Sequence, residues 1–219
     1  MAVETTLPEE VETLEEHARS IARDVLGPGA DRAERSGAWD EASVRAFDQL
    51  DVRSLWLPDD CGGAGDPLAA VVALEALATG GAGGLPLADQ PGPASGALWV
   101  MPDRDRAREM ARSSLGTGAV CAAGVADALR DVGPGFAVSW APGGGAPAAL
   151  VVAARDGVAL VDGADLRAEP VDAMALWASG GVRLHVADGA TPEAFPLDGP
   201  AALVARAVPR LWSGAVLCG

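Results

Sequence analysis

The spacing of apolar residues divides the chain into a helical first half, a run of short strands and a final helical segment. In the first helix, which begins near Pro8, apolar positions recur every three or four residues. These positions are Val11, Leu14, Ala18, Ile21 and Val25. The Gly-Pro-Gly sequence at 27–29 is predicted to end this helix.

Further helices follow in the first half of the chain. Asp40 is a suitable N-cap for a second helix that buries Val44, Phe47 and Leu50. Asp66-Pro67 combines an N-cap with a first-turn proline and predicts a third helix, running to Gly80. Weaker helical patterns cover 86–100 and 103–115.

The stretch LWLPDDCGGAGDP, residues 55–67, connects the second and third of these helices. Its apolar run stops at Pro58, and Asp59 and Asp60 are expected to be surface acids. Gly62 and Gly63 are expected to allow the turn, because glycine adopts backbone conformations that other residues avoid.

From Val120 the pattern changes to short β-type runs separated by Gly, Pro and Asp. These runs cover 119–125, 136–140, 149–154, 157–163 and 181–188. Helical spacing returns after Gly199, where Val204, Val208, Trp212 and Val216 form one line. Pro209 is expected to kink or divide that helix, and its apolar surface to need a cover. The fold class is therefore α+β: a helical bundle, a small, mainly antiparallel β-domain, and the start of another helix.

Composition narrows the class of partner and the compartment. The 219 residues carry a net charge of −15 and 49% hydrophobic residues, so nucleic acid and anionic membranes are not expected partners. Cys61, Cys121 and Cys218 are far apart, as is typical of unpaired thiols in a reducing cytosol. The N-terminus lacks the apolar core of a signal peptide, and no apolar stretch is long enough to span a bilayer. We therefore expect a cytoplasmic protein.

The residues alone indicate no particular reaction. His17 lies among charged residues of the first helix and is interpreted as solvated; His185 alternates with apolar residues and is expected to face outward. No CxxC, HxxxH or GxSxG pattern occurs, and no metal site is expected. The glycine clusters at 80–84 and 143–145 lack the strand-then-helix context of a dinucleotide loop and are interpreted as turns.

A resemblance to a known family adds an expected domain organisation, which the residue patterns do not give. The segments at 22–40 (ARDVLGPGADRAERSGAWD) and 47–80, which contains LPDDCGGAGDP and a helix bearing Glu75, resemble the N-terminal domain of acyl-CoA dehydrogenases. Cys61 replaces the family's usual aromatic residue there. The segment at 206–219 (RAVPRLWSGAVLCG) resembles the opening of the family's C-terminal helical domain. The resemblance implies a helical domain over 1–117, a shortened middle β-domain over 118–197, and the first helix of a truncated C-terminal domain over 198–219.

The resemblance also implies chemistry. Family members bind FAD between the β-domain and the C-terminal helices, a glutamate takes the α-proton of an acyl-CoA, and the flavin takes the hydride. Here the motif that touches the flavin is replaced by CAAGVADALRDVG, which has no Thr, Ser or Glu. By position alone, Cys121, Ala123 and Trp140 are the candidate cofactor-binding residues. No catalytic residue is assigned, because the family's glutamate comes from the C-terminal domain.

Three hypotheses remain open at this stage. The first is an acyl-CoA dehydrogenase-like chain that is inactive alone, either a degenerate subunit that works with a partner subunit or a truncated product or excerpt of a longer enzyme. Its substrate would be an acyl-CoA of fatty-acid or steroid side-chain metabolism. The second is a non-enzymatic interaction module that uses this fold to bind a partner or a second copy through the last helix. The third is an unrelated α+β protein.

Overall fold

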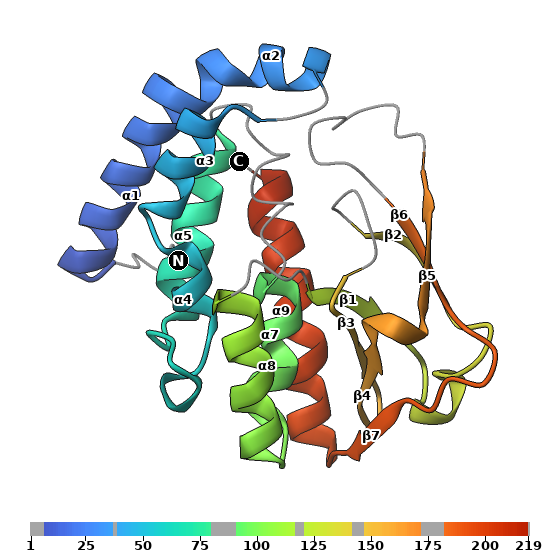
Figure 1. Ribbon diagram of the computed structural model, residues 1–219. Helices are drawn as coiled ribbons and strands as arrows, with labels where there is room; N and C mark the ends of the chain where they lie inside the picture. The colour runs from blue at the N-terminus through green and yellow to red at the C-terminus, as the bar shows by residue number, and fades with distance from the viewer. Residues whose placement is uncertain are drawn as a thin grey trace.

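The computed structural model describes residues 7–36, 39–79, 91–116, 121–141, 147–171 and 182–218. It has three layers: a group of helices, a four-stranded sheet (sheet A) and a three-stranded sheet (sheet B), as Figure 1 shows. The predicted α+β class is confirmed. The GGAGG break at 80–84 and the loop at 142–146 lie outside the described residues.

The first helical segment does not end at Gly27. Helix α1 (Glu9–Ile21) continues into a single π-helical turn (Ala22–Leu26) and then into α2 (Gly27–Ser36). The amide of Gly27 donates to the carbonyl oxygen of Ala22, five residues back. Such a turn inserts one extra residue into the helix. It therefore shifts the buried stripe, so that Leu26 is fully buried while Val25 is only partly buried.

The next helices are begun by the predicted capping residues. The Asp40 carboxylate accepts a hydrogen bond from the amide of Ser43 at 2.8 Å at the start of α3, and Asp66 accepts one from Ala69 at 2.9 Å at the start of α5. The hydrogen bonds from Ser43 lower the pKa of Asp40 to about 2. The elements of this segment are α3 (Glu41–Asp48), α4 (Val52–Trp56), a 3-10 turn (Asp59–Cys61) and α5 (Pro67–Ala78).

Burial in α3 differs from the prediction at one position. Phe47 and Leu50 are buried as expected, but Val44 is 36% exposed and Ser43 is buried in its place. The two remaining predicted helices are present as α7 (Pro91–Val100) and α8 (Arg104–Gly116).

Each sheet takes its strands from separate parts of the β-region of the chain. Sheet A has the order β1-β3-β4-β7 and sheet B the order β2-β6-β5. The strands are β1 (Cys121–Val125), β2 (Ala137–Ala141), β3 (Ala149–Ala154), β4 (Gly157–Asp162), β5 (Leu166–Pro170), β6 (Val182–Val186) and β7 (Glu193–Pro196). All described pairs are antiparallel except β1 with β3, which is parallel.

Sheet A is buried on both faces. Leu150 and Val152 of β3 pack with sheet B, whereas Val151 and Ala153 pack with helices α7 and α8. A strand between two apolar layers needs apolar residues at every position rather than at alternate ones. This explains the continuous ALVVAA sequence at 149–154.

Helix α9 (Gly199–Cys218) lies against α7, α5, β3 and β4 (Figure 1). It is a single helix that passes through Pro209, so the proline does not divide it. Proline has no amide hydrogen and so leaves the carbonyl of Ala205, four residues back, without its helical donor. Close packing against α7 holds this turn, because a β-carbon on Gly96 would lie 2.8 Å from the Val208 β-carbon and 2.9 Å from the Ala205 oxygen.

Substituting Gly96 with alanine is therefore expected to destabilise the protein by about 1–3 kcal/mol, measured by equilibrium urea unfolding. On an open helix the same change would stabilise by about 0.5–1 kcal/mol, since glycine is a poor helix former. Gly199→Ala is the matched control, because a β-carbon there meets no atom within 4 Å. Equal effects of the two substitutions would contradict the close α7–α9 contact.

Candidate functional site

The loop after α4 folds back onto the end of that helix. The amides of Ala64, Gly65 and Asp66 donate to the carbonyl oxygens of Ser54, Leu57 and Leu55 at 2.8, 2.9 and 3.0 Å. Gly62 has a positive φ angle of 86°, as predicted, and Gly65, which was not predicted, has one of 66°. Gly63 has no positive φ angle, and glycine is required there because a β-carbon would overlap Leu57. Leu57 is fully buried at the base of this loop, and Leu55 is partly buried.

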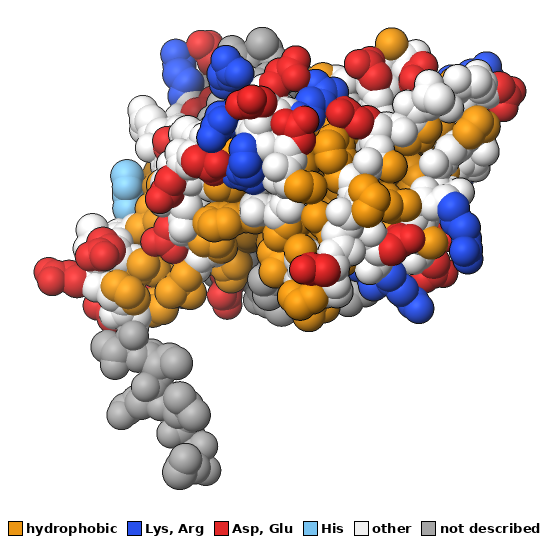
Figure 2. All heavy atoms as spheres, turned by 90° about the horizontal axis from the view of Figure 1, so that it is seen from below, with side chains coloured by type: hydrophobic (Ala, Val, Ile, Leu, Met, Phe, Trp, Pro, Cys, Tyr) orange, Lys and Arg blue, Asp and Glu red, His pale blue; other side chains and the backbone are white. Residues whose placement is uncertain are grey.

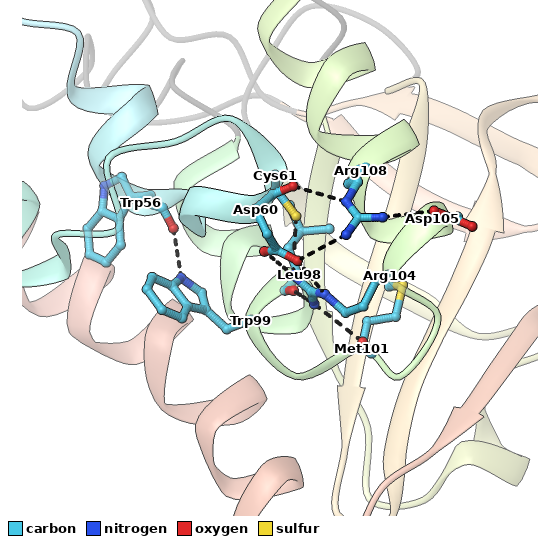
Figure 3. A network of polar contacts seen from close by, with 9 residues as sticks. All are labelled: Trp56, Asp60, Cys61, Leu98, Trp99, Met101, Arg104, Asp105 and Arg108. Atoms are coloured by element: carbon cyan, nitrogen blue, oxygen red, sulfur yellow. Dashed lines mark hydrogen bonds and ion pairs between the residues drawn. The ribbon is translucent and has the colours of Figure 1, made fainter.

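The loop is fastened to α8 by two arginines (Figure 3). Arg104 makes a two-pronged contact with the Asp60 carboxylate, at 2.9 Å from Nε and 2.5 Å from Nη2. Its Nη1 also donates to the Leu98 carbonyl oxygen at 2.6 Å, at the end of α7. Arg108 donates to the Asp60 carbonyl oxygen at 3.1 Å and pairs with Asp105. Asp60 is exposed as predicted, but it also joins α4, α7 and α8.

Cys61 is buried beneath this network. Burial raises the pKa of its thiol, and the nearby Arg104 guanidinium offsets part of that rise. The Arg104 Nη2 lies 3.3 Å from the sulfur. A buried, protonated thiol is a poor nucleophile, so Cys61 has a packing role here rather than a chemical one.

The ion pair between Asp60 and Arg104 gives a pH-dependent contribution to the stability of the fold. Hydrogen bonding from Arg104 lowers the pKa of Asp60 in the folded protein. The ionised carboxylate therefore stabilises the fold fully above the unfolded-state pKa of about 4. This stabilisation is lost as the pH falls through the lowered pKa of the folded state. We expect Asp60→Asn to lower the melting temperature at neutral pH and the deficit to shrink on acidification. Asp59→Asn, at an exposed neighbour with no described ion pair, is the control. A deficit in Asp60→Asn that is constant with pH would contradict this assignment.

The strands that carry the predicted cofactor residues lie close together. In β1, Cys121 pairs with Ala149 and Ala123 with Val151. A β-carbon on Gly124 would lie 3.0 Å from the Val138 side chain, which places β1 directly beside β2.

Trp140 lies in β2 at an irregularity. The pairing of β2 with β6 shifts register between Val138 and Ala141, so an extra residue is accommodated there. Bulges of this kind redirect side chains and are frequent beside functional sites. The side chains of Cys121, Ala123 and Trp140 lie outside the described residues, so their role in cofactor binding stays a prediction.

Arg206 of α9 is a functional candidate that sequence reasoning missed. Its side chain is half-buried, and its buried Nε has no hydrogen-bond acceptor in the described part of the chain. Most other described arginines pair with a carboxylate, including Arg19, Arg32, Arg45, Arg53, Arg104, Arg106, Arg108 and Arg155. Only the structure, not the alanine-rich sequence around it, distinguishes Arg206 from them.

His17 is confirmed as solvated, whereas His185, predicted to face outward, is only partly exposed and has a buried Nε2. His17 is exposed, and His185 alternates with buried Val182, Leu184 and Val186 in β6. The His185 Nε2 lies 3.5 Å from a Glu169 carboxylate oxygen. Among the described residues no cluster of His, Cys, Asp or Glu could hold a metal ion.

A hollow of about 360 Å³ opens between α8 and the edge of sheet A. Arg106 stands at its rim and pairs with Glu193 of β7 at 3.0 Å and with Glu109 at 2.6 Å. Asp162 and Asp165 also line it, so its charge is negative overall. The hollow therefore disfavours an anionic ligand.

No helix in the described ranges is long and apolar enough to cross a membrane. Figure 2 shows one face of the molecule, on which hydrophobic side chains gather over the middle and charged side chains lie around them toward the borders. Large hydrophobic residues that are exposed in the described part are Val44, Leu68, Val125, Leu203 and Val204.

Comparison with known proteins identifies the relatives of this fold. Residues 8–92 match the family model described as acyl-CoA dehydrogenase, N-terminal domain. A search of curated proteins finds no significant sequence match.

Solved structures match almost the whole chain. A glutaryl-coenzyme A dehydrogenase in complex with glutaryl-CoA is 14% identical with a TM-score of 0.77, over 98% of this chain and 64% of that one. Butyryl-CoA dehydrogenase from Megasphaera elsdenii is 15% identical with a TM-score of 0.73, over 98% and 66%. A glutaryl-CoA dehydrogenase from Mycobacterium smegmatis in complex with FADH2 is 16% identical with a TM-score of 0.69, over 96% and 60%. The 219 residues thus span less than two thirds of the length of these solved chains.

Proposed function

Residues 8–92 form a domain of the acyl-CoA dehydrogenase N-terminal family, and from this premise we propose that the chain is one part of an FAD-dependent site for α,β-dehydrogenation of an acyl-CoA thioester. In this proposal the 219 residues do not act alone but complete their site with a second dehydrogenase subunit, in the cytoplasm. The observation that best supports this proposal is that 98% of the chain follows the fold of a glutaryl-CoA dehydrogenase. The domain division at 117 and 197 belongs to the same proposal.

The residues present fit a flavin dinucleotide in part. The Arg206 Nε on α9 has no acceptor among the described residues and suits a phosphate group. The β2 irregularity, which includes Trp140, packs against β1, which carries Cys121 and Ala123. However, the stretch CAAGVADALRDVG, which stands in place of the family motif, has no Thr, Ser or Glu. This combination supports a shared site, in which the chain provides one wall and a partner provides the remaining contacts.

When bound, FAD would accept the hydride in this reaction. The chain's own contribution would be to bind and orient. Arg206 would hold a phosphate, and β1 and β2 would line one side of the ring system. No described carboxylate is assigned as the base, so the proton acceptor is proposed to lie outside the described residues.

A flavin spectrum tests the proposal. The chain purified alone is expected to be colourless, and the chain co-expressed with a neighbouring dehydrogenase subunit is expected to give a yellow complex that oxidises an acyl-CoA. Yellow, active protein from residues 1–219 alone would show that no partner is needed. A colourless complex would contradict a flavin role.

The exposed residues of α9 favour a second candidate, a non-enzymatic interaction module that binds a partner or a second copy. Leu203 is 65% exposed and Val204 is 42% exposed, whereas Ala202, Ala205 and Val208 of the same helix are buried. A surface of this kind suits a protein partner. A stable complex that remains colourless, with Leu203→Asp abolishing it, would favour this candidate over the enzyme.

A further inference from the structure

Helix α8 carries arginines on both sides of a narrow apolar stripe. Among its residues whose side chains are described, the buried ones are Ala107, Met110 and Ala111. With about 100° per residue, Arg104 and Arg108 flank this stripe on one side and Arg106 flanks it on the other. The two sides of α8 therefore face different neighbours.

The first side holds the loop at 55–67. Arg104 binds the carboxylate of Asp60 and Arg108 binds its carbonyl oxygen, as Figure 3 shows. The Arg104 Nη2 also lies 3.3 Å from the Cys61 sulfur. Cys61 is 5% exposed and belongs to the apolar cluster that contains Met110. Helix α8 therefore covers this thiol.

The other side of α8 reaches sheet A. The Arg106 Nε donates to a carboxylate oxygen of Glu193 in β7 at 3.0 Å, and its Nη1 donates to Glu109 of α8 itself at 2.6 Å. Among the described residues, no hydrogen bond or ion pair joins Glu193 to the loop at 55–67. Helix α8 is thus fastened by charged groups on both sides, to two segments that are independent of each other.

These ion pairs are open to solvent, so dissolved salt weakens them. The side chains of Arg104 and Asp60 are 31% and 43% exposed, and those of Arg106 and Glu193 are 35% and 46% exposed. Two of the three buried residues of α8 are alanines, which bury little apolar area. By contrast, α5 buries seven of its 12 residues. A segment with few buried apolar contacts opens locally at a lower free energy than the core does.

We propose that α8 is an ionic strap, in which Arg104, Arg106 and Arg108 hold the loop at 55–67 and β7 together and release both when their ion pairs are screened. Opening detaches α8 as one unit, uncovers the Cys61 thiol and widens the hollow between α8 and sheet A, while the core around Trp56 stays folded. The junction between the helices and sheet A thereby responds to ionic strength. This proposal does not rest on the proposed function, because it concerns contacts within the chain.

Labelling of Cys61 by a maleimide measures the opening, because a buried thiol reacts only after it becomes accessible. Mass spectrometry of the labelled peptides separates Cys61 from Cys121 and Cys218. Raising NaCl from about 0.1 M to about 1 M shortens the Debye length from about 10 Å to about 3 Å. We expect this change to raise the Cys61 labelling rate of the wild type about tenfold, which corresponds to about 1.4 kcal/mol. An unchanged rate would overturn the proposal.

Glu193→Gln tests whether α8 opens as a unit, because Glu193 is bound to the side of α8 that faces away from the loop. The variant is expected to raise Cys61 labelling at low salt about two- to fivefold, the effect of losing one exposed ion pair. Fraying of the loop alone predicts no change in this variant, and that result would overturn the strap. Glu41→Gln is the matched control and is expected to label at the wild-type rate. Its carboxylate pairs with Arg45 of α3 at 3.0 Å, the same distance as in the Glu193–Arg106 pair, and the change of charge is equal.

Urea distinguishes local opening from unfolding of the whole chain. Opening of α8 exposes little surface, whereas global unfolding exposes most of it, and the urea dependence of each process scales with the surface exposed. Below the unfolding transition, Cys61 labelling is therefore expected to be nearly independent of urea in the wild type and in Glu193→Gln. A labelling rate that follows the urea dependence of global unfolding, measured by circular dichroism on the same protein, would show that α8 does not open separately and would overturn the proposal.

Discussion

Replacing Trp56 with alanine is expected to lower the free energy of unfolding by about 3–5 kcal/mol. Trp56 is fully buried, in a cluster with Leu26, Leu74 and Leu77 from the surrounding helices. Removing the indole leaves a cavity that these helices, being fixed by other contacts, can fill only in part. Since small proteins are stable by about 5–15 kcal/mol, this loss is a large share of the total. Equilibrium urea unfolding measures it.

Two further variants separate burial from the other properties of this tryptophan. Leu68→Ala removes a 50% exposed side chain from α5 and is expected to cost only about 0.5 kcal/mol. Trp56→Phe also removes the indole Nε1, which has no acceptor among the described residues, and is expected to cost about 1 kcal/mol. Comparable losses in Trp56→Ala and Leu68→Ala would contradict the placement of Trp56 in the core.

Helix positions and caps could be predicted from the sequence because they depend on neighbouring residues. Asp40 and Asp66 cap the helices that the patterns indicated. The Gly-Pro-Gly sequence was wrongly predicted to end a helix, because the π-helical turn at Ala22–Leu26 lets the chain continue. The local pattern does not encode that extra residue, and the burial of Leu26 instead of Val25 follows from it.

The two strands that the sequence patterns did not predict, β5 and β7, lie at the edges of the sheets. Both β5 and β7 are edge strands in the described sheets, and only Leu166 and Phe195 are buried in them. A strand with one buried side chain has no alternating pattern to detect. The parallel pairing of β1 with β3 likewise depends on contacts between distant segments.

In the candidate site, too, features set by neighbouring residues could be predicted and features set by distant contacts could not. The need for glycine at Gly62 could be predicted from the local sequence, but the partner of Asp60 lies 44 residues away in α8. Arg206 resembles any other helical arginine in the sequence, and only the fold shows that its buried Nε has no acceptor in the described part of the chain. The family resemblance supplied the fold, and the positions of unpaired groups had to come from the structure.

Replacing Gly63 with alanine is expected to destabilise the protein by about 3 kcal/mol, at the upper end of the usual cost of overpacking. A β-carbon on Gly63 would overlap the carbonyl oxygen and β-carbon of Leu57. Relief requires the loop to move away from α4, because the obstacle is backbone. That movement would strain the hydrogen bonds of Gly65 to Leu57 and of Ala64 to Ser54. It would also draw Asp60 away from Arg104, so the loss extends beyond the local clash.

Gly62→Ala is the control for Gly63→Ala, because the two glycines are adjacent but constrained by different forces. Gly62 has a φ of 86° and no atom within 4 Å of the added carbon, so alanine there meets only backbone strain of about 1–2 kcal/mol. Urea unfolding of both variants should therefore place Gly63→Ala clearly below Gly62→Ala in stability. The pH dependence assigned to Asp60 should weaken in Gly63→Ala and persist in Gly62→Ala, because only the first substitution displaces the loop from α8. The reverse order of stability would mean that the loop does not rest on Leu57.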